Sequence, residues 1–415
     1  MKPIFVSAQP DQTYFHWQVE IYLYQFAKHG IAARCYALLG YRGDKPSAAG
    51  LELAKKYPHV LFYKDSRDLT VPNYYIPSIR PHLLKQFFAE YPDLGKCVFY
   101  HDADIFLVQM PKFDLLTADD ICYLSDTVSY IGYKYIDECQ KRYKAKYPSM
   151  GDDELLMGMC NIVGVPVDIV KANDANSGGA QYLLKNIDAA FWAEAETACQ
   201  SLYNFTKVFD TKYPIDHGIQ IWTADMWVIL WLLWKRGSQS RVHKALDFSW
   251  ATNSVADYHK YPIFHLAGVT NANDGMFYKG EYTNKHLIKE YIRNPSIFDS
   301  VNKNNATYEY VQIVKELANG KALEQTKKTR FLFDASGTSW SSVYQKDETS
   351  KILERNVWRS ANKNYLIFHN SSSWVITHKQ WEAELKEGSG GFAFSSADEP
   401  YEGGWNIPSR IQILS

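Results

Sequence analysis

The sequence has few cysteines, no long apolar run and no excess of charge of either sign. Its six cysteines include no CxxC pair, and none lies beyond Cys199. A secreted disulfide scaffold has denser cysteines, so this pattern favours reduced thiols and argues against a zinc site. The most apolar run, residues 226–234, has nine residues, whereas a membrane span needs roughly 20. These absences predict a cytoplasmic location with no membrane span.

The charge balance weighs against a dedicated nucleic-acid-binding protein. Lys and Arg total 45 and Asp and Glu total 46, for a net charge of −1, whereas nucleic-acid binders usually carry a basic excess. Aromatic residues are abundant, at 15% of the chain. Such side chains fill protein cores, and they also stack on nucleobases and sugar rings. A length of 415 residues favours two or three domains at about 150 residues each.

The first 110 residues alternate between strand-like and helix-like patterns. Strands are predicted at 2–8, 32–39, 59–63 and from 96, and helices at 14–29 and 81–91. This alternation predicts an α/β fold with a parallel sheet between helices, whose ligands bind beyond the carboxyl ends of the strands. Residues 285–328 read as a solvated helical extension. From 331 to 415, short β-like runs between Ser, Gly and Asn clusters predict a small all-β module.

The strongest local motif is a pair of carboxylates at the end of a buried strand. Asp102 and Asp104 follow the apolar run 97–100. Two carboxylates in such a place are costly unless they are neutralised, and oxygen ligands suit Mg²⁺ or Mn²⁺. Two solvated carboxylates at a strand end are the alternative. The motif predicts a divalent cation that neutralises a diphosphate leaving group.

Three more features add to this motif. His265 ends the apolar run 262–264, where it is either a metal ligand or a histidine of the core. Gly178 and Gly179 allow close approach of backbone to a ligand, or form an ordinary turn. Asp225 lies at the start of an apolar helix, where the helix dipole stabilises it. We expect Asp225 to be a general base or an acceptor for a sugar hydroxyl, with dipole compensation alone as the alternative.

These motifs, in this order, resemble a GT-A glycosyltransferase. The main ones are HDAD (101–104), SGGAQ (177–181), TADMW (223–227) and PIFHLAGV (262–269). The chain is most similar to the group that includes plant hydroxyproline O-arabinosyltransferases, peptidyl-serine galactosyltransferases and their viral and microbial relatives. The resemblance spans about residues 2–285 and includes SAQPDQTYFHWQ, SIRPHLLKQF, LSDTVSYIGYKYI and GMFYKGEY. It implies a GT-A domain at 1–284, with a Rossmann-like, mostly parallel sheet flanked by helices. The extension 285–328 and the aromatic-rich module 331–415 follow this domain, and the module is a departure from the related plant enzymes.

The resemblance also implies a set of ligands and of residues that hold them. The donor is expected to be a nucleoside-diphosphate sugar, most simply a UDP-sugar, with Mn²⁺ or Mg²⁺ as the cofactor. The family pattern places the metal at Asp102, Asp104 and His265, and the catalytic base of inverting members at Asp225. It places donor contacts at Gln9, Asp11, Tyr14, Asp102, Gly178, Gly179 and Lys279.

Several alternatives stay open at this stage. The acceptor is a glycan, a protein or a modified nucleic acid, and the stereochemistry is inverting or retaining. One alternative keeps the chemistry but transfers the sugar to a hydroxymethylated base in DNA. Another is a non-catalytic carbohydrate-binding protein built on a transferase fold. The module at 331–415 either packs its aromatic rings in a core or presents them to a carbohydrate or acceptor.

Overall fold

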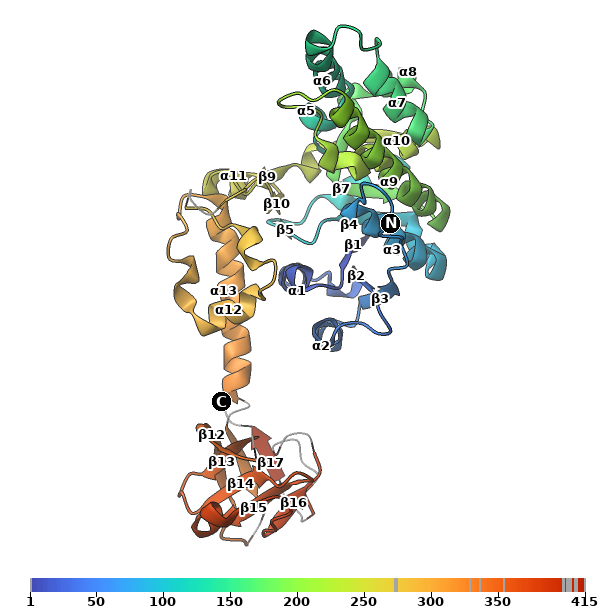
Figure 1. Cartoon of the computed structure of the whole chain (residues 1–415). Coiled ribbons are helices and arrows are strands. Elements are labelled where there is room, and N and C mark those ends of the chain that lie inside the picture. The colour runs from blue at the N-terminus through green and yellow to red at the C-terminus, as the bar shows by residue number, and fades with distance from the viewer. Residues whose placement is uncertain are drawn as a thin grey trace. The chain divides into compact units, whose positions relative to one another are not determined.

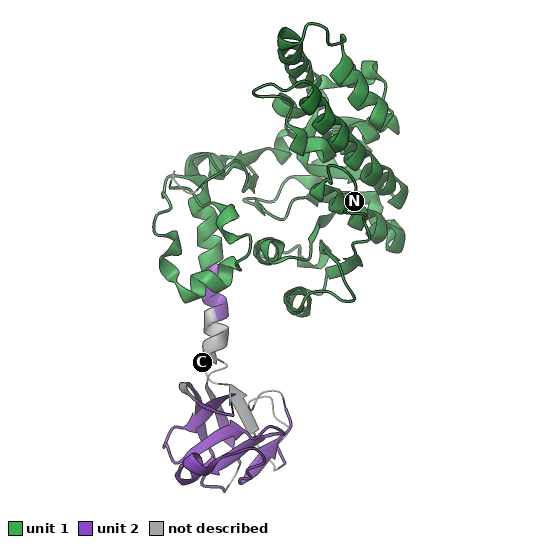
Figure 2. Ribbon diagram, viewed as in Figure 1, with its two compact units in different colours: residues 1–315 green, residues 316–415 purple. Residues whose placement is uncertain are grey.

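The chain folds into two compact units, Met1–Lys315 and Glu316–Ser415 (Figure 2). The computed structural model describes residues 2–271, 275–327, 330–335, 337–353, 355–397, 400, 405–406 and 410–413. Residues 285–315, expected to form an extension, are part of the first unit. Helix α13 (Ala306–Lys327) runs across the division between the units.

The first unit is built on a mixed seven-stranded sheet with the order β3-β2-β1-β4-β7-β6-β8 (Figure 1). Its strands are β1 (Ile4–Pro10), β2 (Cys35–Tyr41), β3 (Val60–Lys64), β4 (Cys97–His101), β6 (Cys122–Asp126), β7 (Gly178–Lys185) and β8 (Ser240–Val242). Strands β3, β2, β1 and β4 are parallel, and β6 is parallel to β8, but β7 is antiparallel to both neighbours. The predicted α/β class is confirmed, with a mixed sheet.

Helices cover both faces of this sheet, so its central strands are buried along their length. All seven residues of β1 are buried. Val6 packs in one apolar core and Phe5, its neighbour in sequence, in another. Successive side chains of a strand point to opposite faces, and a strand covered on both faces reads as a continuous apolar run. The helices of this unit are α1 (Thr13–Ala27), α2 (Ala48–Lys56), α3 (Ile79–Glu90), α4 (Phe113–Leu116), α5 (Val128–Ile131), α6 (Tyr133–Lys146), α7 (Glu154–Val163), α8 (Val167–Ala172), α9 (Ala189–Lys212), α10 (Ala224–Lys235), α11 (Val255–Lys260) and α12 (Leu287–Arg293).

A second, three-stranded sheet lies beside the end of β4. It consists of β5 (Ile105–Leu107), β10 (Ile263–His265) and β9 (Phe248–Trp250), in the order β5-β10-β9. Strand β10 is antiparallel to β5, with His265 opposite Ile105. Because β5 follows β4 after only three residues, this pairing brings His265 next to the acidic turn although the two are far apart in sequence.

The second unit contains one curled antiparallel sheet of seven strands, which confirms the predicted all-β module (Figure 1). Its strands are β11 (Arg330–Asp334), β12 (Ser342–Ile352), β13 (Arg355–Ser360), β14 (Tyr365–His369), β15 (Trp374–His378), β16 (Ala393–Ser395) and β17 (Arg410–Ile413). Trp358 and Trp374 pack in its core, whereas Trp340 and Tyr365 are partly buried and Trp381 is 47% exposed. The aromatic residues therefore divide between the core and the surface.

The structure also bears on the thiols and the apolar runs. All six cysteines lie in the described part of the chain, and each is a buried free thiol. Within the described residues, no helix has both the length and the apolar character that crossing a bilayer requires. Helix α10, which contains the longest apolar run, is 12 residues long and is buried in the core of the first unit.

Candidate active site

The acidic motif forms the turn between β4 and β5. Strand β4 ends at His101, and Asp102 and Asp104 lie in the three residues before β5 begins. Asp104 is buried, and the Asp102 side chain is 20% exposed. Burial lowers the pKa of His101 to about 4, so its imidazole is neutral near pH 7. The two carboxylates therefore lie at the end of a buried strand, next to a neutral imidazole.

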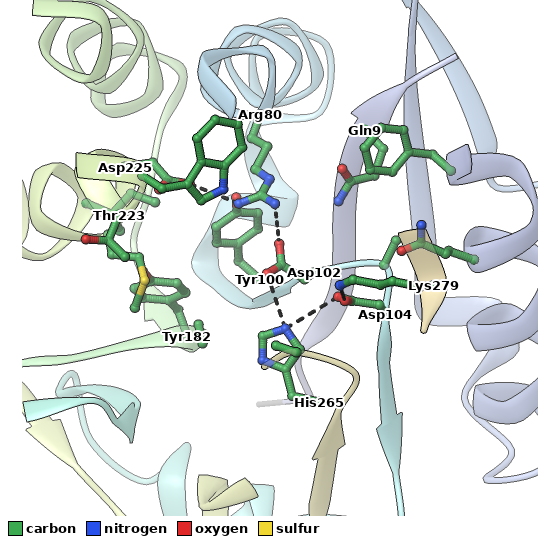
Figure 3. Close-up of a pocket in the computed structure, with 18 of the residues that line it drawn as sticks. Gln9, Arg80, Tyr100, Asp102, Asp104, Tyr182, Thr223, Asp225, His265 and Lys279 are labelled. Atoms are coloured by element: carbon green, nitrogen blue, oxygen red, sulfur yellow. Dashed lines mark hydrogen bonds and ion pairs between the residues drawn. The ribbon is translucent and has the colours of Figure 1, made fainter. Parts of the chain in front are cut away.

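His265 reaches this turn from β10 and completes a group of three metal-binding side chains (Figure 3). Its Nε2 lies 3.6 Å from Oδ2 of Asp102 and 3.4 Å from Oδ1 of Asp104. The ligand atoms of the three residues all lie within 4.8 Å of one another. Two carboxylates and an imidazole suit Mn²⁺ or Mg²⁺. The residues present therefore fit the divalent cation that the resemblance implies.

Two cationic side chains already contact these carboxylates. Lys279 forms an ion pair with Oδ2 of Asp104, and Arg80 lies 2.9 Å from Oδ1 of Asp102. Burial alone raises the pKa of Asp104, but the Lys279 ammonium and the nearby His265 ring outweigh it and hold this pKa well below its ordinary value. Asp104 is therefore ionised at neutral pH, as a metal ligand needs to be.

Arg80 connects the acidic turn to Asp225. One guanidinium nitrogen lies 2.9 Å from Asp102 and the other 2.9 Å from Oδ2 of Asp225. The Tyr75 hydroxyl lies 2.8 Å from the other oxygen of Asp225 and 2.6 Å from the carbonyl oxygen of Trp222. Burial raises the pKa of Asp225, and Arg80 opposes that rise. Both carboxylate oxygens are thus held in place.

Asp225 is the second residue of α10, as the sequence predicts, and its backbone position places negative charge at the helix N-terminus. Thr223 occupies the N-cap position, but its hydroxyl donates to the carbonyl of Gln220 and makes no side-chain cap. The helix start is therefore stabilised by Asp225 and Tyr75, whose hydroxyl lies 3.3 Å from the Asp225 amide nitrogen.

One cavity of about 390 Å³ has in its wall the metal-binding group together with Arg80, Lys279 and Asp225. Trp250 forms part of its wall and stacks on the His265 ring, with the ring centroids 6.0 Å apart. Trp222 lines the cavity and is 56% exposed. The wall includes Gln9, Tyr14, Phe15, Arg80, Asp102, Asp104, Tyr130, Ala180, Tyr182, Trp222, Asp225, Trp250, His265 and Lys279. A cavity with ionic groups at its centre and aromatic walls suits an anionic ligand that carries rings.

The structure brings together most of the predicted site residues but not all of them. Gln9 and Tyr14 line the cavity with the metal-binding group, Asp225 and Lys279. Asp11 is turned away: its carboxylate lies 2.6 Å from His16 and accepts hydrogen bonds from the backbone and hydroxyl of Ser47. It therefore fixes the start of α2.

The two glycines on β7 are also absent from the cavity wall among the described residues. A Cβ at Gly178 would lie 2.4 Å from the Cβ of Leu124, and one at Gly179 would lie 2.5 Å from Cε of Met226. Both glycines thus permit close packing of β7 against its neighbours. Ala180, with a φ of 63°, is the residue of this segment that faces the cavity.

Sequence reasoning missed Arg80 and Tyr75. One signal was available: Arg80 is the second residue of α3, where the helix dipole disfavours positive charge. A cation at this position indicates that an anion elsewhere compensates it. Tyr75 lies in an irregular segment before α3, and its sequence context carries no comparable signal.

Comparison with known proteins adds no family to this description. No protein-family model matches the chain, and no curated protein matches its sequence. The functional assignment therefore depends on the residues that line the cavity.

Proposed function

We propose that the first unit is a metal-dependent glycosyltransferase of the GT-A type. It would transfer a sugar from a nucleoside-diphosphate sugar, most simply a UDP-sugar, to an acceptor hydroxyl. The observation that carries this proposal is the convergence of Asp102, Asp104 and His265 at the carboxyl end of β4. That end of a strand is where α/β proteins bind their ligands, and the same cavity holds Lys279 and Asp225.

The charges in the cavity suit a diphosphate leaving group. Asp102, Asp104 and His265 would hold Mn²⁺ or Mg²⁺, which when bound supplies positive charge that stabilises the departing diphosphate. Lys279 lies beside Asp104 with its side chain 25% exposed to the cavity. A lysine ammonium binds phosphate as a compact point charge. We therefore expect Lys279 to exchange Asp104 for a phosphate oxygen when the donor binds.

Asp225 is the residue best placed to act on the acceptor. In an inverting reaction, the acceptor hydroxyl gives its proton to a carboxylate oxygen of Asp225 as it attacks the sugar. Arg80 and Tyr75 fix the orientation of that carboxylate, so no reorganisation is needed at the moment of transfer. In a retaining reaction, Asp225 would instead orient the donor sugar through its hydroxyls.

The two sides of the cavity suggest where donor and acceptor lie. Gln9 and Asp225 are on opposite sides of Asp102 (Figure 3). We expect the nucleoside beside Gln9 and Tyr14, and the acceptor beside Asp225 and the exposed Trp222. Aromatic rings on both sides offer faces for a nucleobase and for a sugar ring.

A screen of nucleotide sugars tests this proposal without knowledge of the acceptor. The protein is incubated with Mn²⁺ and each nucleotide sugar, and the released nucleoside diphosphate is measured. We expect metal-dependent release from one donor and its loss in Asp104→Asn. Asp210→Asn is the matched control, because Asp210 accepts a hydrogen bond from Tyr143 away from the cavity. Release from no donor, together with glycan binding, would instead indicate a carbohydrate-binding protein.

A further inference from the structure

A buried chain of polar side chains leads from the core to His265. The Ser125 hydroxyl lies 2.7 Å from the carbonyl oxygen of Leu246 and 2.8 Å from Oε1 of Gln181. Nε2 of Gln181 lies 3.2 Å from Nδ1 of His265. Ser125 and Gln181 are fully buried, and His265 is 6% exposed. Each polar atom in this chain therefore has to find its partner within it.

The number of hydrogens fixes how the chain is oriented. The Ser125 hydroxyl has one hydrogen, and the Leu246 carbonyl is an acceptor only. With the amide oxygen of Gln181 toward Ser125, as the atoms are placed, one hydrogen would have to serve two acceptors. Which end of an amide is oxygen is decided from the hydrogen-bond network. With the amide turned over so that its nitrogen faces Ser125, Gln181 donates to Ser125 and Ser125 donates to Leu246, so that each contact of Ser125 has one donor and one acceptor.

This orientation leaves the amide oxygen of Gln181 facing Nδ1 of His265. Nδ1 then carries a hydrogen that it donates to Gln181. We propose that Gln181 is a positioning residue that keeps the Nδ1 of His265 protonated and so reserves Nε2 for a divalent cation. The cation itself rests on the proposed function, whereas the hydrogen on Nδ1 follows from the buried chain alone.

The position of His265 agrees with this assignment. Its Nε2 faces one oxygen each of Asp102 and Asp104. A divalent cation would take the place of the hydrogen between Nε2 and these carboxylates, and three ligand atoms would then surround it. A ligating histidine typically donates its other ring N–H to an oxygen, which sets its orientation and raises its basicity. Carboxylates and carbonyls usually provide that oxygen, and here the amide of Gln181 does so.

An irregularity in the sheet places Gln181 in this chain. The pairing of β6 with β7 shifts between Leu124 and Ser125, so that Ser125 lies opposite Gly179. Ala180, inside the shift, has a φ of 63°. Extra residues in one strand of a pair re-aim the side chains beside them. The shift brings the Ser125 hydroxyl to the Gln181 side chain.

Nitrogen NMR of the full chain tests the protonation of Nδ1 directly. With ¹⁵N-labelled histidine and the metal-free protein, long-range ¹H–¹⁵N correlations identify which ring nitrogen carries the hydrogen. The His265→Asn variant assigns the signals. We expect Nδ1–H in the wild type and loss of this preference in Gln181→Met. A wild-type ring protonated only on Nε2 would overturn the proposal, whether or not the protein binds a metal.

Manganese binding tests whether the orientation of His265 by Gln181 raises the affinity for a divalent cation. Outer partners of ligating histidines typically contribute about 10–100-fold to metal affinity, so we expect Gln181→Met to weaken Mn²⁺ binding by about that factor in a calorimetric titration. Gln181→Glu keeps an acceptor for Nδ1–H but loses the donor to Ser125, so it should bind Mn²⁺ more tightly than Gln181→Met. Gln140→Met is the matched control, since Gln140 is also buried and bonds the start of α7.

The outcomes separate the two proposals. Folding of each variant is checked by circular dichroism and its melting temperature. Loss of Mn²⁺ affinity in Gln181→Met, with tighter binding in Gln181→Glu than in Gln181→Met and with Gln140→Met near the wild type, supports the role of Gln181. Equal affinity in Gln181→Met and the wild type overturns it. If the wild type binds no Mn²⁺, the proposed function fails, and the NMR measurement alone decides the role of Gln181.

Discussion

Lys279 forms an ion pair with Asp104, although the two residues are 175 positions apart in the chain. The pair lies in the wall of the cavity, where it neutralises one of the proposed metal ligands. Lys279 contacts Oδ2 of Asp104, whereas Oδ1 is the oxygen that faces His265. The ammonium opposes a second cation at this carboxylate, and a diphosphate offers Lys279 a new partner. The cation and the nucleotide should therefore bind cooperatively.

The variant Lys279→Met separates these two effects. Without the ammonium, Mn²⁺ alone should bind about tenfold more tightly, a change of about 1.4 kcal/mol, because no neighbouring positive charge opposes the cation at Asp104. The nucleoside diphosphate should bind more weakly in the presence of Mn²⁺. Calorimetric titrations measure both affinities. Lys235→Met is the control, since Lys235 pairs with Glu194 away from the cavity; unchanged affinities in Lys279→Met would refute the exchange of partners.

Arg80 should contribute to stability through the two carboxylates that it joins. Removing one partner of a buried ion pair costs about 3–5 kcal/mol, because a charge is left buried and unpaired. The Arg80 side chain is 23% exposed and the Asp225 side chain is 7% exposed. We therefore expect Arg80→Met to lower the free energy of unfolding by about 3 kcal/mol.

The double variant Arg80→Met/Asp225→Asn shows whether that loss comes from the unpaired charge. Replacing the carboxylate by an amide removes the uncompensated charge, so the double variant should be more stable than Arg80→Met alone. Chemical denaturation of the wild type, both single variants and the double variant completes the cycle. If the losses in free energy of unfolding of the two single variants simply add in the double variant, a direct interaction between Arg80 and Asp225 would be contradicted.

Asp225 should set the pH dependence of transfer if the reaction is inverting. Only the deprotonated carboxylate accepts a proton, so the rate rises with pH through the pKa of Asp225. Burial raises this pKa above the ordinary aspartate value of 3.8, despite the opposing effect of Arg80. The fall in rate on acidification should therefore begin at a higher pH than for an ordinary aspartate.

The variant Asp225→Asn tests the same role. General acid–base catalysis contributes about 10²–10⁴-fold, and we expect transfer to fall by that factor while the affinity for the nucleoside diphosphate stays within about twofold, because Asp225 touches no predicted phosphate contact. NMR of the product reports the anomeric configuration. Retention of configuration would assign Asp225 to orientation of the donor sugar instead.

The second unit should unfold independently, because the described residues of its apolar core all belong to that unit. Trp358 is 1% exposed in that core. Replacing a buried tryptophan by alanine typically costs about 3–5 kcal/mol. Trp358→Ala should therefore lower the unfolding temperature of the second unit and leave that of the first unit unchanged. Differential scanning calorimetry resolves the two. A shift of both transitions would contradict separate cores.

The sequence predicted the parts of the site that follow from local patterns. The buried strand β4 is a continuous apolar run, and Asp102 breaks it in a way that marks its end. His265 also ends an apolar run, so the ends of β4 and β10 could both be predicted from the sequence. The α/β class and the all-β second unit are confirmed for the same reason, since each depends on the period of apolar residues.

The remaining parts depend on contacts between distant segments. Arg80 becomes important only because α3 lies between the acidic turn and α10, and no local pattern records that arrangement. The antiparallel direction of β7 is set by pairing with β4 and β6. For Gly178 and Gly179 the sequence predicted a ligand contact, but neither glycine is among the described residues that line the cavity. Paired glycines have the same local pattern whether they approach a ligand or a neighbouring strand.

The central claim is that Asp102, Asp104 and His265 hold a divalent cation. The most direct measurement is an anomalous difference map at the manganese edge, from a crystal of the full chain soaked with Mn²⁺ and a nucleoside diphosphate. The account predicts a peak bonded to both carboxylates and to Nε2 of His265, with the diphosphate beside Lys279. A map from such a crystal with nucleotide in the cavity and no peak among these three residues would contradict it.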